Sequence, residues 1–167
     1  MEKLIEIKNL KTFFYTEAGV AKAVNNISFD IYKGEVLGIV GESGSGKSVT
    51  SLSINRLIPN PPGRIESGEI LYNGTNLLDL SYDEMSKYRG NHISMIFQEP
   101  MTSLNPVLKI STQMNEILMH HDGLSEEEAT QKSIEMLHSV GIVNPELRIN
   151  DYPHQFSGGM RQRIMIA

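Results

Sequence analysis

The residues best suited to chemistry form a glycine-rich run at positions 41–48, which reads GESGSGKS and follows the apolar stretch 36–40. The spacing G-x-x-x-x-G-K-S is that of a phosphate-binding loop between a strand and a helix. A triphosphate concentrates negative charge, so its site needs closely spaced backbone N–H donors and a helix N-terminus directed at the anion. Glycine allows that close approach. The run therefore predicts a nucleoside triphosphate site.

Each position of the loop has an expected role. Lys47 should reach the β- and γ-phosphates as a point charge, and the Ser48 hydroxyl should ligate Mg²⁺. Ser43 and Ser45 should contribute backbone donors more than side chains. The bland alternative is a glycine-rich turn that holds only a stray anion. We expect ATP and Mg²⁺ to be bound by Gly41, Glu42, Ser43, Gly44, Ser45, Gly46, Lys47, Ser48 and Val49.

A second glycine-rich helix start lies far down the chain, where residues 157–163 read SGGMRQR. Ser157 is placed as the N-cap, and Gly158 and Gly159 open the helix. Alone, such a capped start is common and usually binds nothing. Together with the phosphate loop, it indicates a second anion-binding helix end.

The elements that must position these loops follow from residue patterns. Near-alternation predicts strands at residues 4–7 and 21–31 of a half-exposed antiparallel sheet, and residues 67–72 predict another strand before an Asn73-Gly74 turn. The run VLGIV at 36–40 predicts a strand buried on both faces, and HISMIF at 92–97 a second short apolar strand. A helix is expected at 47–58, before Pro59.

The composition changes after residue 98, where helices are expected near 111–121 and 125–140. Capping-box patterns pair Ser81 with Glu84 and Ser125 with Glu128. Residues 161–167 form an amphipathic helix without a stop signal, so we expect the chain to be cut at this end.

Composition excludes several classes of function. The 167 residues suit one domain, and the absence of cysteine rules out disulfides and thiolate metal sites. A net charge of −5 gives no broad basic surface, so no nucleic acid is expected as the main partner. No apolar stretch approaches the roughly 20 residues that span a bilayer, so a membrane role would depend on a partner.

Together, the motifs resemble the nucleotide-binding domains of ABC transporters, whose signature L-S-G-G-Q corresponds to FSGGM at residues 156–160. Met160 stands where the general signature has Gln. The segments FQEPMTSLNP (97–106) and YPHQFSGGMRQR (152–163) are similar to the oligopeptide and dipeptide import branch, which also includes nickel importers.

The resemblance implies an α/β fold, in which a RecA-like P-loop NTPase core carries an N-terminal antiparallel β-subdomain and an inserted α-helical subdomain. Residues 1–98 would form the β-subdomain and ATP-binding core, 99–156 the helical subdomain, and 157–167 the start of the signature helix. The domain would be incomplete.

The resemblance also assigns site residues. Gln98 would be the Q-loop glutamine, which touches Mg²⁺ and the attacking water and acts in catalysis with Lys47. An aromatic residue of the first hairpin would stack on adenine; among residues 13–15 Tyr15 is favoured, followed by Phe14. The signature residues Ser157, Gly158 and Gly159 would serve the ATP of a partner subunit.

By the same resemblance, the full-length protein would be a transport-coupled ATPase. Its partners would be a second nucleotide-binding subunit, identical or related, transmembrane permease subunits contacted near residues 98–108, and indirectly a solute-binding protein. It would lie at the cytoplasmic face of the membrane. The acidic pair and the switch histidine are expected beyond Ala167, so the fragment should bind ATP without useful turnover.

Three other classes of protein compete with this interpretation. A soluble ABC-type ATPase of DNA repair or translation would carry both loops. A small-molecule kinase or GTPase would explain the phosphate loop alone, but neither needs the second capped helix, and the N-K-x-D guanine motif is absent from the sequence. The third alternative is a non-hydrolytic nucleotide-binding module.

Overall fold

The computed structural model describes residues 2–97 and 103–167. The chain divides into two compact units, Met1–Ser94 and Met95–Ala167, and each has a hydrophobic core of its own. No helix in the described part of the chain is long and apolar enough to cross a membrane.

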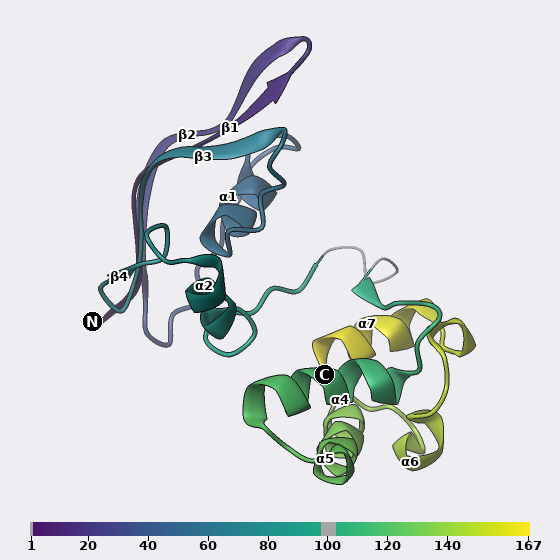
Figure 1. The fold of residues 1–167 in the computed structure, drawn as a ribbon. Coiled ribbons are helices and arrows are strands. Elements are labelled where there is room, and N and C mark those ends of the chain that lie inside the picture. Colours follow the sequence, from purple (N-terminus) through teal and green to yellow (C-terminus); the bar gives the residue numbers. More distant parts are fainter. Residues whose placement is uncertain (1, 98–102) are drawn as a thin grey trace. The chain divides into compact units, whose positions relative to one another are not determined.

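The N-terminal unit is built on an antiparallel sheet of strand order β2-β1-β3-β4, with β1 at Lys3–Thr16, β2 at Gly19–Tyr32, β3 at Gly63–Tyr72 and β4 at Thr75–Asn76 (Figure 1). Ile7 of the central strand β1 pairs with Phe29 on one side and with Ile70 on the other. The predicted turn joins β3 to β4. Its residues Asn73 and Gly74 have φ angles of 46° and 83°, the left-handed region that such turns require.

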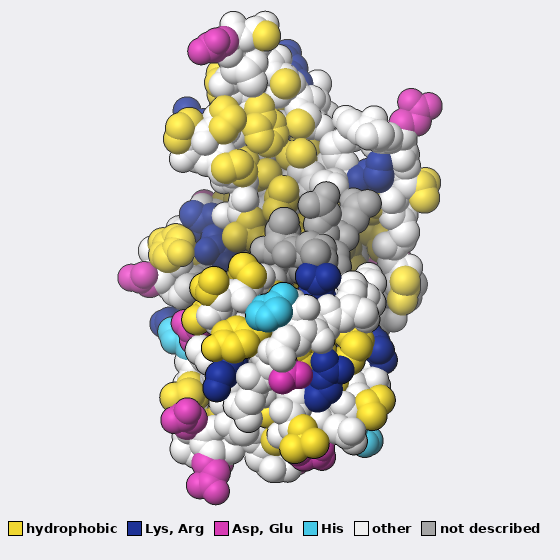
Figure 2. All heavy atoms as spheres, turned by 90° about the vertical axis from the view of Figure 1, so that its right-hand side faces the viewer, with side chains coloured by type: hydrophobic (Ala, Val, Ile, Leu, Met, Phe, Trp, Pro, Cys, Tyr) yellow, Lys and Arg dark blue, Asp and Glu magenta, His cyan; other side chains and the backbone are white. Residues whose placement is uncertain are grey.

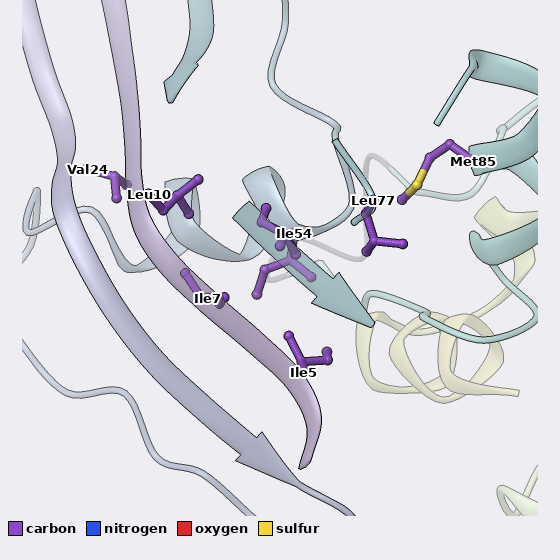
Figure 3. Close-up of a cluster of buried hydrophobic side chains, with 8 residues drawn as sticks. Ile5, Ile7, Leu10, Val24, Ile54, Leu77 and Met85 are labelled. Atoms are coloured by element: carbon purple, nitrogen blue, oxygen red, sulfur yellow. The ribbon is translucent and has the colours of Figure 1, made fainter. Parts of the chain in front are cut away.

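Helices α1 (Lys47–Ile54) and α2 (Tyr82–Tyr88) complete this unit. Their buried side chains meet the apolar side chains of the sheet in one cluster (Figure 3), which consists of Ile5, Ile7, Leu10, Val24, Ile54, Ile70, Leu77 and Met85. Helix α1 ends before the expected residue 58. Arg56 has a positive φ of 52°, which a right-handed helix does not allow, and Arg89 donates to the carbonyl oxygens of Asn55 and Arg56 at 2.8 and 3.1 Å.

Two predicted strands are not formed. Residues 36–40 and 92–97 belong to no strand, apart from an isolated bridge between Arg89 and Ile93. Val36 and Val40 are 98% and 93% exposed rather than buried. A central strand depends on neighbours for its hydrogen bonds, and within the described residues the only sheet is β2-β1-β3-β4. Figure 2 shows hydrophobic side chains on one face of the N-terminal unit.

The C-terminal unit is helical, with α4 at Ile110–Asp122, α5 at Glu126–Ser139, α6 at Pro145–Arg148, a 3₁₀ turn η1 at Pro153–Gln155, and α7 at Gly158–Ile166. Its core consists of Ile110, Leu137, Ile142, Ile149, Phe156 and Ile164. The two helices predicted at 111–121 and 125–140 are confirmed within a residue or two of their ends.

Both predicted capping boxes are present. The Ser125 hydroxyl accepts from the Glu128 N–H at 3.3 Å, and the Glu128 carboxylate accepts from the Ser125 N–H at 2.9 Å; Ser81 and Glu84 form the same pair. Hydrogen bonds from Ser125 hold the pKa of Glu128 below its usual value. The first turn of α5 is thus fixed by residues three positions apart.

Candidate nucleotide-binding site

The glycine-rich loop 41–48 leads directly into α1, as its spacing predicts. Gly44 and Gly46 have φ angles of 81° and 89°, the left-handed region where side chains with a Cβ are strained. Gly46 is the N-cap of α1, and a Cβ on it would lie 2.2 Å from the Ala23 carbonyl oxygen. The loop therefore packs its backbone against β2, a contact that only glycine permits.

The ammonium group of Lys47 lies inside its own loop. Nζ donates to the carbonyl oxygens of Gly41 and Glu42 at 2.8 and 2.7 Å, and to Oγ of Ser45 at 3.2 Å. Three acceptors thus surround the one cation of the loop, and they place its charge beside the backbone that would meet a phosphate. A phosphate oxygen could replace any of these acceptors.

The start of α1 has the free donors that a phosphate needs. No side chain caps the helix and no acidic residue lies in its first turn. In the described residues, no hydrogen bond uses the N–H groups of Gly46, Lys47 or Ser48. Ser48 itself is exposed. Unpaired N–H groups, the positive end of the helix dipole and a lysine ammonium fit a polyphosphate, and the Ser48 hydroxyl suits Mg²⁺, a cation that prefers oxygen ligands.

The aromatic residues of the first hairpin point to different faces of the sheet. The Tyr15 hydroxyl donates to Oε1 of Glu66 at 2.9 Å, which raises the pKa of Tyr15. Phe14 lies on the opposite face, because a Cβ built on Gly63 would be 2.8 Å from its ring and 2.5 Å from Ile58, which follows α1. Phe14 thus shares the sheet face that carries α1 and the phosphate loop.

The same face assignment follows from β1 itself. Side chains alternate along a strand, so Phe14 lies on the face of Thr12. The Thr12 hydroxyl is buried and lies 2.9 Å from Oγ of Ser53 in α1. Tyr15 was predicted as the stacking residue ahead of Phe14, and the choice between the two stays a prediction; the structure shows only that Phe14 shares the sheet face of Thr12.

The second glycine-rich motif lies in the C-terminal unit at the start of α7. Ser157 is the N-cap, as predicted, and its Oγ accepts from the Met160 N–H at 3.4 Å. Ser157, Gly158 and Gly159 are exposed, and a Cβ on either glycine would meet nothing within 4 Å. The helix end is open to an incoming group. Gln98, the predicted catalytic residue and Mg²⁺ ligand, lies outside the described residues.

Two contacts near these motifs have no signal in the sequence. Glu66 accepts a hydrogen bond from the Tyr15 hydroxyl across two strands, and Arg148 donates to Gln155 before and to Met160 after residues 157–159. Each pair is brought together by the fold rather than by sequence spacing. No motif could have identified either residue.

With the geometry of both motifs known, comparison with known proteins decides the family. Residues 24–167 match the family described as "ABC transporter". The chain belongs to this family. Among solved structures, the dimeric ABC transporter cassette MJ0796 is 28% identical with a TM-score of 0.83, covering 98% of this chain and 67% of that one. A second structure of that cassette is bound to ADP and Pi, with a TM-score of 0.81. The predicted cassette fold is therefore confirmed.

Two of the similar curated proteins are named as peptide transport components. The chain is 52% identical over 165 residues to the oligopeptide transport ATP-binding protein OppD of Bacillus subtilis, covering 99% of this chain and 46% of the relative. It is 53% identical over 167 residues to the dipeptide transport ATP-binding protein DppD of Lactococcus lactis, covering 99% and 48%. The chain thus spans about half the length of these relatives.

Proposed function

We propose that this chain is part of an ATP-binding subunit that couples ATP binding and hydrolysis to the import of oligopeptides or dipeptides. The observation that carries the proposal is the loop 41–48, whose N–H donors at the start of α1 are unpaired and whose lysine donates to carbonyl oxygens of the same loop. Similarity to OppD and DppD supports the peptide class of solute.

Within this proposal, different residues of the loop bind the phosphates and Mg²⁺. The N–H groups of Gly46, Lys47 and Ser48 bind phosphate oxygens, and Lys47 exchanges one or more of its loop acceptors for the β- and γ-phosphates. The Ser48 hydroxyl and Gln98 hold Mg²⁺, which when bound neutralises charge on the phosphates. Gln98 also orients the attacking water.

The proposed partners follow from the second motif. Ser157, Gly158 and Gly159 present an open helix N-terminus to the ATP bound by a second nucleotide-binding subunit, since all three residues are exposed and a Cβ on either glycine would meet nothing within 4 Å. In the proposed dimer, ATP lies between the two nucleotide-binding subunits. Closing and reopening of this dimer would move transmembrane permease subunits, which receive solute from a binding protein. The subunit would therefore sit peripherally at the cytoplasmic face of the membrane.

Two variants of the full-length subunit test this proposal. Lys47→Ala should abolish ATP binding and ATPase activity, because it removes the only side-chain cation of the loop. Ser157→Arg should leave binding to the isolated subunit intact but block ATP-dependent association with the partner subunit and peptide uptake. Uptake and association that persist in Ser157→Arg would contradict the role given to the signature.

For adenine, we propose Phe14 as the stacking residue, because its ring lies on the sheet face that carries α1. Base stacking contributes about 1–3 kcal/mol in nucleic-acid complexes, or roughly five- to 150-fold in affinity. Phe14→Ala should lower ATP affinity within that range, whereas Tyr15→Ala should change it little. A larger loss in Tyr15→Ala would restore Tyr15 to this role.

A further inference from the structure

One arginine of the C-terminal unit contacts both ends of the signature segment. Arg148, the last residue of α6, donates from Nη2 to the carbonyl oxygen of Gln155 at 2.9 Å, and its guanidinium carbon lies 4.2 Å from the ring centre of Phe156. Its Nη1 lies 3.8 Å from Sδ of Met160. These contacts fall immediately before and immediately after residues 157–159.

The signature residues have little packing of their own. Gly158 and Gly159 carry no side chain, and the N-cap bond between Ser157 Oγ and the Met160 N–H is long at 3.4 Å. Their conformation must therefore be set by the flanking residues. Phe156 is buried in the core of this unit and is bonded to Ser157, so the packing of Phe156 fixes where the backbone of Ser157 begins.

We propose that Arg148 is a positioning residue, which holds residues 155–160 in the shape that receives a nucleotide phosphate from a second subunit. This inference rests on the proposed function, because it concerns the same signature site. Arg148 touches no nucleotide in this account; it acts through Gln155, Phe156 and Met160.

The chemistry of the side chain suits this role. A guanidinium is a planar fork that can donate in several directions while its face stacks on an aromatic ring. Nε of Arg148 donates to Oδ2 of Asp151 at 3.2 Å. This bond fixes the plane of the guanidinium group, whose other nitrogens contact Gln155 and Met160. A lysine at position 148 would keep the charge, but its single nitrogen could not serve all of these groups at once.

The chain offers a matched control on α7. Nη1 of Arg163 donates to the carbonyl oxygens of Val140 and Gly141 at 3.3 and 2.7 Å, so it joins α7 to the end of α5. Among the described residues, the Arg163 guanidinium makes no hydrogen bond or ion pair with residues 155–160. An Arg163→Lys variant therefore weakens the contact of α7 with Val140 and Gly141 but leaves the contacts of Arg148 with residues 155–160 unchanged.

The test compares Arg148→Lys, Arg163→Lys and wild type in the full-length subunit. Binding of a fluorescent ATP analogue to the isolated subunit should be the same in all three, because loop 41–48 is unchanged. Association with the partner subunit in a non-hydrolysable ATP analogue should weaken about tenfold or more in Arg148→Lys, which corresponds to ~1.4 kcal/mol. In the same variant, amide exchange should accelerate at residues 156–160 and remain unchanged in α4.

Two results would overturn the inference: association of Arg148→Lys at the wild-type level, or equal losses in the two lysine variants. If Arg148→Lys does not fold, Asp151→Ala decides instead, since it removes the acceptor that holds Nε of Arg148 and should weaken association in the same direction. Failure of the proposed function gives a different pattern, in which wild type shows no nucleotide-dependent association or Ser157→Arg retains it.

Discussion

The glycines of the phosphate loop allow a sharp prediction about its packing. Gly44 and Gly46 share a left-handed backbone, with φ angles of 81° and 89°. Alanine at either position costs about 1–2 kcal/mol for that conformation. The two sites differ in their surroundings: a Cβ on Gly44 meets nothing within 4 Å, whereas one on Gly46 lies 2.2 Å from the Ala23 carbonyl oxygen.

The contact between a Cβ at position 46 and the Ala23 carbonyl oxygen can be relieved only if the backbone moves. Real Cβ atoms stay at least 3.0 Å from their neighbours, so Gly46→Ala must separate the loop from β2 by about 0.8 Å, the difference between 3.0 and 2.2 Å. Overpacking of this kind costs about 1–3 kcal/mol. Gly46→Ala should therefore destabilise the protein by about 2–5 kcal/mol, against about 1–2 kcal/mol for Gly44→Ala.

The assay is thermal unfolding of the nucleotide-free protein, because phosphates would approach both glycines when bound. Each kcal/mol lowers the midpoint by roughly 2–4 °C in a protein of this size, so Gly46→Ala should melt about 2–12 °C below Gly44→Ala. Equal midpoints in the two variants, or a lower midpoint in Gly44→Ala, would refute the close packing of Gly46 on β2.

Three further predictions concern the C-terminal unit. Asn115→Ala should cost about 1–3 kcal/mol, because the buried Ser133 hydroxyl, which donates to Asn115 at 2.9 Å, loses its acceptor; an unchanged melting midpoint would contradict this. Leu137→Ala should cost about 2–5 kcal/mol from the core, as measured by denaturant unfolding, and a loss below ~1 kcal/mol would show that the site is not tightly packed. The lowered pKa of Glu128 stabilises the folded state above the ordinary value of 4.5, and this contribution is lost as pH falls through the lowered value. Wild type should therefore lose thermal stability on acidification more steeply than Glu128→Gln, and superimposed pH profiles would disprove the effect.

Predictions that depend on neighbouring residues were the most successful. The capping boxes of Ser81 and Ser125, the N-cap of Ser157 and the Asn73-Gly74 turn all form as predicted. In each case, a side chain meets a backbone group within a few positions, or a residue type supplies an unusual φ angle. The sequence carries both partners of such contacts in one short stretch.

Predictions that depend on distant partners were less successful. Residues 36–40 have the composition of a buried strand, yet they are exposed and unpaired. Helix α1 ends earlier than predicted, and the carbonyl oxygens of Asn55 and Arg56 beyond its end accept hydrogen bonds from Arg89, more than thirty positions away. Composition reports that a segment can be buried, but burial and strand pairing require a second segment to cover it.

The phosphate loop shows what the sequence alone determined. GESGSGKS specifies the glycine backbone, the helix start and the lysine charge, because all three are properties of adjacent residues, and family membership followed from the same motif together with FSGGM. Tertiary structure decided the rest. It packed Gly46 on β2, turned Phe14 rather than Tyr15 toward the face of α1, and brought Arg148 around the signature, because each contact joins segments that meet only when sheet and helices pack.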